Sequence, residues 1–162
     1  MPDKIFTLYL STQTPAGGLY TPVGDTTNKS QITWSINWNA LYGGMIFTGQ
    51  ERFARVKFQL YSLSQNGIFT WAANSGVLAI QGLGNQFSNS QNGLTLGACS
   101  PIDTPVAIAT ASIMYGDTLQ TGGVLMNLPS GYRDITVLML DRTGVLMPNM
   151  LDYQLILQFE ME

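Results

Sequence analysis

The sequence predicts an all-β protein, a two-sheet antiparallel sandwich of the single jelly-roll kind with about eight strands. Three observations predict it. Apolar residues recur at every second position in several segments, which is the period of a half-buried strand. No amphipathic stretch at helical spacing is longer than about two turns. Finally, short turn sequences separate the apolar segments, and one long connection leaves room for a crossing between sheets.

The clearest strand covers residues 31–38, where apolar and polar side chains alternate without a break. Residues 55–61 and 153–161 repeat the alternation. One face of each strand should therefore be buried, and we expect these side chains to form the core: Ile32, Trp34, Ile36, Trp38, Val56, Phe58, Leu60, Leu155, Leu157 and Phe159.

Less regular segments complete the expected set of strands. They are apolar and bounded by Gly, Pro, Asn or Asp, which is typical of strand ends. The candidates cover residues 5–10, 68–73, 77–83, 106–115, 124–128 and 135–140.

The connections carry matching turn chemistry. Asn66-Gly67 is the dipeptide that closes a tight hairpin, because both residues accept a positive φ. The segment 141–144 ends in a glycine where a left-handed residue is needed. Residues 82–105 form the longest irregular stretch, and we interpret them as a loop that crosses between the two sheets.

The whole chain, residues 1–162, is expected to be one domain. An immunoglobulin-like sandwich is the alternative, but it usually needs only about 100 residues and would leave these loops too long.

Charge is scarce. Only 10% of residues are charged, against a usual share of about a quarter. Ser, Thr, Asn and Gln make up about three residues in ten. Such a surface can be buried against a partner without desolvating ions. The composition fits a self-assembling subunit, and it equally fits a neutral extracellular β-domain.

The basic residues do not predict a nucleic-acid partner. Phosphate binding needs clustered Lys and Arg, whereas the seven in this chain are scattered and the net charge is −3. Arg52, Arg55 and Lys57 come closest to a cluster, with Arg55 and Lys57 on one strand face. We interpret that face as solvated, so direct genome binding is not expected.

The residue types for catalysis are largely missing, and we expect no enzyme, cofactor or metal site. The chain has no histidine, which removes the commonest general base and the commonest zinc ligand. Cys99, which we place in a polar loop, therefore lacks a histidine partner. Asp25 and Asp103 are the only acids we would consider for calcium, and neither has a second acid nearby.

The tryptophans raise the possibility of a sugar-stacking platform. Trp34 and Trp38 share a face with Ile32 and Ile36, which favours core packing for both. Trp71 follows an apolar segment near a turn, and its role stays open.

Neither a membrane span nor a secretory leader is expected. No run of 18 apolar residues exists, and the first residues lack a basic, then apolar, leader. The pattern at Asn28-Lys29-Ser30 matches a glycosylation acceptor, but without a leader we set it aside.

Several segments resemble the single jelly-roll penton and minor capsid proteins of eukaryotic double-stranded DNA viruses, such as virophages, polinton-like viruses and relatives of giant viruses. The resemblance covers about half of the chain, mostly strands. It is carried by IFTLYL at residues 5–10, INWNAL at 36–41, FARVKF at 53–58, ITVLMLDRTG at 135–144 and DYQLILQFE at 152–160.

The resemblance implies a building block of an icosahedral capsid that is located in the virion. The expected partners are copies of this chain, as a homopentamer or, second, a homotrimer, together with other capsid proteins such as a major capsid protein. The alternative is a carbohydrate- or receptor-binding β-sandwich such as a viral fibre head. A cellular trimeric jelly-roll ligand is a third hypothesis, against which the missing leader counts.

Overall fold

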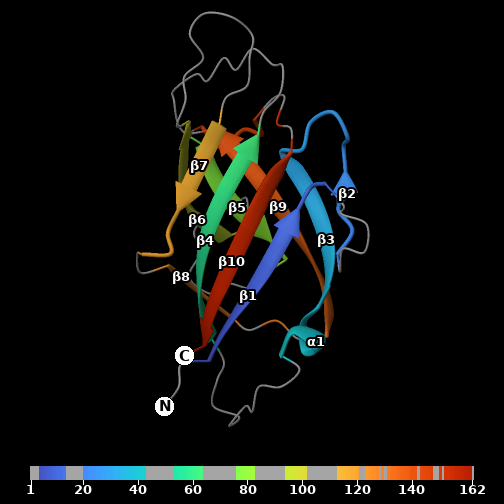
Figure 1. Cartoon of the computed structure of the whole chain (residues 1–162), viewed down its shortest axis with the longest axis vertical. Helices are drawn as coiled ribbons and strands as arrows, with labels where there is room; N and C mark the ends of the chain where they lie inside the picture. The colour runs from blue at the N-terminus through green and yellow to red at the C-terminus, as the bar shows by residue number, and fades with distance from the viewer. Residues whose placement is uncertain are drawn as a thin grey trace, which may run out of the picture.

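The protein was analysed as a computed structural model that describes residues 4–13, 20–42, 53–63, 76–82, 94–101, 113–120, 123–127, 129, 131–141, 143–147, 150 and 152–161. Within these residues the chain forms ten strands and one short helix. The strands make two antiparallel sheets of five strands each, packed face to face (Figure 1). The predicted all-β sandwich is confirmed.

Sheet A is built around β10 (Tyr153–Met161), which lies between β1 (Ile5–Ser11) and β4 (Phe53–Leu63). The eleven-residue strand β4 is long enough to pair with two short strands on its other side. These are β7 (Ile113–Asp117) and β8 (Val124–Asn127), which pair with opposite halves of β4. The first and the last described strands are thus neighbours.

Sheet B is built around β9 (Tyr132–Asp141), which lies between β3 (Gln31–Asn37) and β5 (Gly76–Gln81). The sheet ends at β2 (Val23–Gly24) on one edge and β6 (Leu94–Pro101) on the other. The strand β2 has only two residues, so it covers only a small part of β3.

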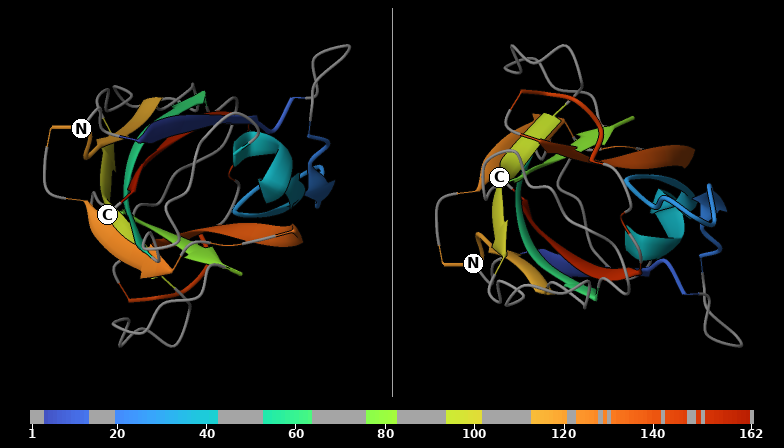
Figure 2. Two further views of the ribbon diagram at one scale, coloured as in Figure 1. Left: turned by 90° about the horizontal axis from the view of Figure 1, so that it is seen from below. Right: turned by 90° about the horizontal axis from the view of Figure 1, so that it is seen from above.

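The two sheets are hydrogen-bonded to each other on one side of the sandwich, where Ser100 of β6 pairs with Tyr115 of β7 and Pro101 pairs with Met114. On the opposite side the sheets end separately at β1 and β2. We call these the joined side and the open side. Figure 2 looks along the sandwich and shows α1 (Trp38–Tyr42) at the open side, across from β6 and β7.

The core lies between the sheets and follows the predicted alternation. All ten side chains that were expected to face inward are buried, and Trp34 and Phe58 have no exposed surface. Strands β1 and β10 alternate in phase, since each buried residue of β1 pairs with a buried residue of β10. The central part of the prediction is therefore confirmed.

Trp38 is buried as expected, but it does not belong to a strand. The strand β3 ends at Asn37, and Trp38 is the first residue of α1. The Asn37 side chain accepts a hydrogen bond from the amide of Ala40 at 3.2 Å, which is the bond that an N-cap residue makes. The local capping chemistry of Asn37 thus ends the strand one residue early.

The predicted loop at residues 82–105 is wrong in its second half, because it contains β6. Opposite β6, Leu78 pairs with Gly97 and Ala79 pairs with Thr95, so Leu96 is an extra residue at a bulge. A bulge shifts the phase of side-chain alternation. That shift hides the period of two in the sequence.

Other expected segments have mixed outcomes. The candidates at 5–10, 77–83, 124–128 and 135–140 correspond to β1, β5, β8 and β9. The segment 106–115 is described only from residue 113, where β7 begins. The candidate at 68–73 and the turn at Asn66-Gly67 lie outside the described residues.

Candidate assembly surface

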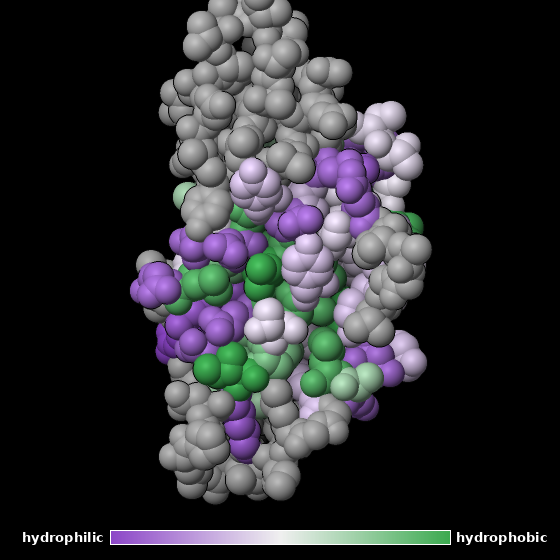
Figure 3. Space-filling model, viewed as in Figure 1, coloured by the Kyte–Doolittle hydropathy of each residue, from purple (hydrophilic) through white to green (hydrophobic). Residues whose placement is uncertain are grey.

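The strand alternation leaves the side chains on the outer face of sheet A partly or fully exposed. The register places its side chains in rows across the strands, such as Tyr9 beside Ile156 and Gln59. Figure 3 shows this face with hydrophilic and hydrophobic side chains mixed rather than separated. A mixed, sparsely charged face is suited to contact with another protein surface.

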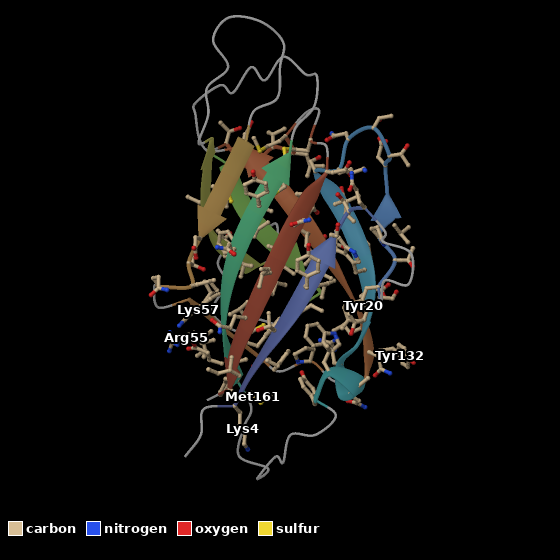
Figure 4. The ribbon with its side chains drawn as sticks, viewed as in Figure 1. Lys4, Tyr20, Arg55, Lys57, Tyr132 and Met161 are labelled. Atoms are coloured by element: carbon tan, nitrogen blue, oxygen red, sulfur yellow. The ribbon has the colours of Figure 1, made fainter. Side chains whose placement is uncertain are left out.

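The few charges on this face are paired. Lys57 Nζ of β4 lies 2.7 Å from Glu160 Oε1 of β10, and the pair is diagonal, because Lys57 is directly opposite Gln158. Arg55 is directly opposite Glu160 in the register. Figure 4 shows Arg55 and Lys57 together at one end of β4. The acidic neighbour disfavours phosphate binding on this face. Arg52 lies outside the described residues.

A polar cluster connects the strands at the open side. The Asp152 carboxylate accepts hydrogen bonds from Thr12 Oγ1 at 3.0 Å and from Gln13 Nε2 at 2.9 Å, and it pairs with the Lys29 ammonium. The pKa of Asp152 lies below its usual value. Burial alone would raise it, but the hydrogen bonds from Lys29, Gln13 and Thr12, together with the charge of Lys29, have the larger combined effect. Asp152 is therefore ionised at neutral pH, and it links the segment that follows β1 to the segment that precedes β3.

Cys99 was expected in a polar loop, and this prediction is wrong. It lies in β6 with only 1% of its surface exposed, beside Gly116 and Phe58. Burial raises the pKa of its thiol to about 12, so the reactive thiolate is scarce at neutral pH. Cys99 is a packing residue of the joined side.

The remaining candidates for binding that the structure describes do not come together into a site. Asp25 accepts hydrogen bonds from the amide and the hydroxyl of Thr27, both at 2.7 Å, which is a local turn. Among the described residues, no group of three or more acidic or cysteine side chains is placed to hold a metal. Asp103 and Trp71 lie outside the described residues, and Trp34 and Trp38 are core residues, as expected.

Among the described residues, the exposed aromatic side chains are tyrosines, which the sequence reasoning did not consider. Tyr132 is 83% exposed at the start of β9, and Tyr9 is 51% exposed on β1. Tyr9 lies between the apolar residues Leu8 and Leu10, and this alternation would have identified its side chain as exposed.

No helix within the described part of the chain is long and apolar enough to cross a membrane. Comparison with protein-family models gives no match, and a search of curated proteins finds no relative of this chain.

Proposed function

We propose that this chain is a structural subunit that assembles with copies of itself into a viral capsid, as a penton or minor capsid protein of the single jelly-roll type. The observation that carries the proposal is the nested pairing of the strands. The first strand pairs with the last, and the pairs inside it follow the same order: β1 with β10, β3 with β9, β4 with β7 and β5 with β6.

Nested pairing of this kind arises when one long antiparallel ribbon is rolled up so that alternate pairs fall into opposite sheets. The pairs β1–β10 and β4–β7 lie in sheet A, and the pairs β3–β9 and β5–β6 lie in sheet B. A jelly roll has eight strands and two Greek keys and recurs in viral capsid domains. The short strands β2 and β8 are additions to this plan. The nesting supports the jelly-roll assignment over an immunoglobulin-like sandwich.

The surface supports assembly rather than catalysis in this proposal. A fold alone does not specify a function, so the outer faces should also be suited to assembly. Polar, uncharged residues such as Thr7, Gln154 and Gln59 separate the half-exposed apolar side chains of sheet A. Such groups can be desolvated and paired again in an interface at lower cost than ions.

The proposed assembly is a homopentamer, with a homotrimer second, placed in the capsid shell beside other capsid proteins such as a major capsid protein. A head-to-tail contact closes into a ring when its rotation permits. Each contact of a stable ring has to bury on the order of 1,200–2,000 Å². Few ion pairs would cross the contact, so the ring should survive moderate salt.

Light scattering and native mass spectrometry test the proposal. The purified protein at micromolar concentration should show five times the subunit mass of 17.7 kDa, with and without about 0.5 M salt and after nuclease treatment. A mass of three subunits would show that the assembly is a trimer and not a pentamer. A monomer under every condition would contradict self-assembly.

One observation favours a second function, the binding of carbohydrate by an exposed aromatic ring. Tyr132 pairs with Asn37 across β9 and β3, and the neighbouring pair, Ser35 and Asp134, is hydrogen-bonded at 2.5 Å. Rings beside amide and carboxylate groups can stack on sugars and bind their hydroxyl groups. Glycan-array binding by a monomer, lost in Tyr132→Ala and kept in Tyr9→Ala, would favour this function.

A further inference from the structure

The strand β1 forms the outer edge of sheet A. Its hydrogen bonds with β10 identify which of its backbone amide and carbonyl groups point toward the open edge. Among the described residues, β10 is the one strand that pairs with β1. The Met161 amide donates to the Lys4 carbonyl at 3.0 Å, and the Thr12 amide donates to the Tyr153 carbonyl at 3.1 Å. In an antiparallel pair, hydrogen-bonded positions alternate along each strand. The even-numbered residues of β1 therefore bond to β10.

The odd-numbered residues consequently point their amide and carbonyl groups away from β10, toward the open edge. These residues are Ile5, Thr7, Tyr9 and Ser11, and their side chains lie on the outer face of the sheet.

The strand β1 itself has none of the sequence features that usually protect an edge strand. Proline, internal charge, bulges and very short strands all discourage pairing with another chain. The segment Ile5–Ser11 has no proline and no charged residue, and it pairs with β10 at seven consecutive positions without a shift. By contrast, the opposite edge strand, β2, has only two residues.

We propose that β1 is a pairing site for the β1 strand of a second copy of this chain, in antiparallel register across a two-fold axis at Leu8. In this register Thr7 of one copy faces Tyr9 of the other, and Ile5 faces Ser11. Every residue whose amide and carbonyl point to the open edge then lies opposite a residue of the same kind in the other copy. Each such pair exchanges both backbone hydrogen bonds. Sheet A continues from one copy into the next.

The absence of charge along the edge favours a second copy as the occupant. The register places the uncharged residues 5–11 of the two copies opposite each other, so no like charges repel and no ion has to be desolvated. Lys4 of one copy falls opposite the uncharged Thr12 of the other, and Asp152 keeps its ion pair with Lys29 of its own copy. Figure 4 shows Lys4 beside Met161, at the end where β1 begins.

The pairing should be weak, and it is separate from the proposed ring. Two seven-residue strands bury less than the 1,200–2,000 Å² that stable interfaces commonly bury. A ring contact is head-to-tail, whereas this contact joins identical surfaces. We expect dissociation constants in the range of tens to hundreds of micromolar.

Backbone hydrogen exchange measured by nuclear magnetic resonance over a concentration series tests the pairing. Amides of Phe6, Leu8 and Leu10 should be protected at every concentration, because they bond to β10. Amides of Ile5, Thr7 and Tyr9 should become protected only as concentration rises toward about 1 mM. Fast exchange of these three amides at every concentration would overturn the proposal.

Isotope-filtered contacts between labelled and unlabelled copies test the register. Contacts between Thr7 of one copy and Tyr9 of the other are expected. Protected odd-numbered amides without these contacts would mean that a different segment covers β1, which would also overturn the proposal. Since both readouts are local to β1, they are independent of whether the pentamer forms.

A matched pair of charge variants completes the test. Thr7→Lys places a cation at the open edge, which should weaken pairing by at least about tenfold. Gln154→Lys places the same charge on the same outer face of β10, inside the sheet, and should leave pairing unchanged. Equal pairing by both variants would count against the edge contact, and thermal unfolding confirms that both are folded.

Discussion

The joined side and the open side of the sandwich are closed by different means. On the joined side, strand pairing carries the backbone of β6 directly onto β7. On the open side, the edge strands β1 and β2 are not paired with each other. Side chains of α1 and a polar cluster at Asp152 link the sheets there. The joined side therefore depends on close backbone approach, whereas the open side depends on the size and polarity of particular side chains.

Small residues allow the close approach on the joined side. A Cβ atom at Gly116 would lie 2.5 Å from Cys99 Sγ, 2.9 Å from Cε2 of Phe58 and 3.1 Å from the Ala98 carbonyl oxygen. Only glycine leaves room for these neighbours, because interiors are packed without spare volume.

Aromatic rings fill one end of the open side. Phe6 of β1 stacks on Phe159 with ring centroids 4.6 Å apart, and its edge meets Tyr42 of α1 at 5.4 Å. Trp38 packs edge to face on Phe159 at 5.5 Å, and its indole donates to the Arg133 carbonyl at 3.2 Å. The helix α1 thus bridges β10 in sheet A and β9 in sheet B.

The largest effect is expected at the open side, from Trp38→Ala. Removing a buried tryptophan takes away its contacts with Phe159 and Tyr42 and leaves a cavity, which should lower the free energy of unfolding by about 3–5 kcal/mol. Denaturant unfolding measures the change. Tyr132→Ala is the control, because its exposed ring should change stability by less than about 0.5 kcal/mol. Similar losses in both variants would contradict the role of α1 as the closing element.

An intermediate effect is expected at the joined side, from Gly116→Ala. The added methyl group overlaps Cys99 Sγ, and we expect a loss of about 1–3 kcal/mol in unfolding free energy. In the background of Cys99→Ala, which removes the sulfur, the same substitution should cost less. The double-mutant cycle measures this coupling. Additive losses would show that Phe58 and the backbone, rather than Cys99, limit the space.

The sequence predicted regular strands well and the joined side poorly. Strands β1, β3, β4 and β10 have unbroken alternation, since each has one buried and one outer face. In β6 the bulge at Leu96 interrupts the alternation, so Cys99 seemed to belong to a loop. Close packing requires glycine at position 116, and no local pattern in the sequence indicates this.

The candidate surface was beyond sequence reasoning for a related reason. The alternation indicates which β1 side chains face outward, but it does not reveal that β1 lies at an edge. That fact depends on β10 pairing from more than 140 residues away. Likewise, the contacts of Asp152 with Thr12 and Lys29 join segments that no local pattern connects.

The smallest effect is expected at the polar end of the open side, from Asp152→Asn. At neutral pH the substitution removes the ionic contact with Lys29, and we expect a loss of about 1 kcal/mol because the pair is partly exposed. The pKa of Asp152 is lower in the folded protein than in the unfolded chain, so its stabilisation is present above about pH 4 and is lost as pH falls through the folded pKa.

The difference in unfolding free energy between wild type and Asp152→Asn should accordingly shrink below about pH 4. Denaturant titrations at several pH values give this difference directly. A difference that stays constant down to about pH 2 would mean that hydrogen-bond geometry at Asp152, rather than its charge, connects the segments.

The position of β10 between β1 and β4 also affects how the chain can fold while it is being synthesised. A ribosome adds about 5–20 residues per second, so roughly 7–30 s separate the appearance of β1 from that of β10. During that interval β1 has no neighbour in sheet A, and its uncharged, alternating sequence is exposed on both edges. Until β10 is synthesised, an uncharged strand of this kind can pair with the same strand of a neighbouring nascent chain.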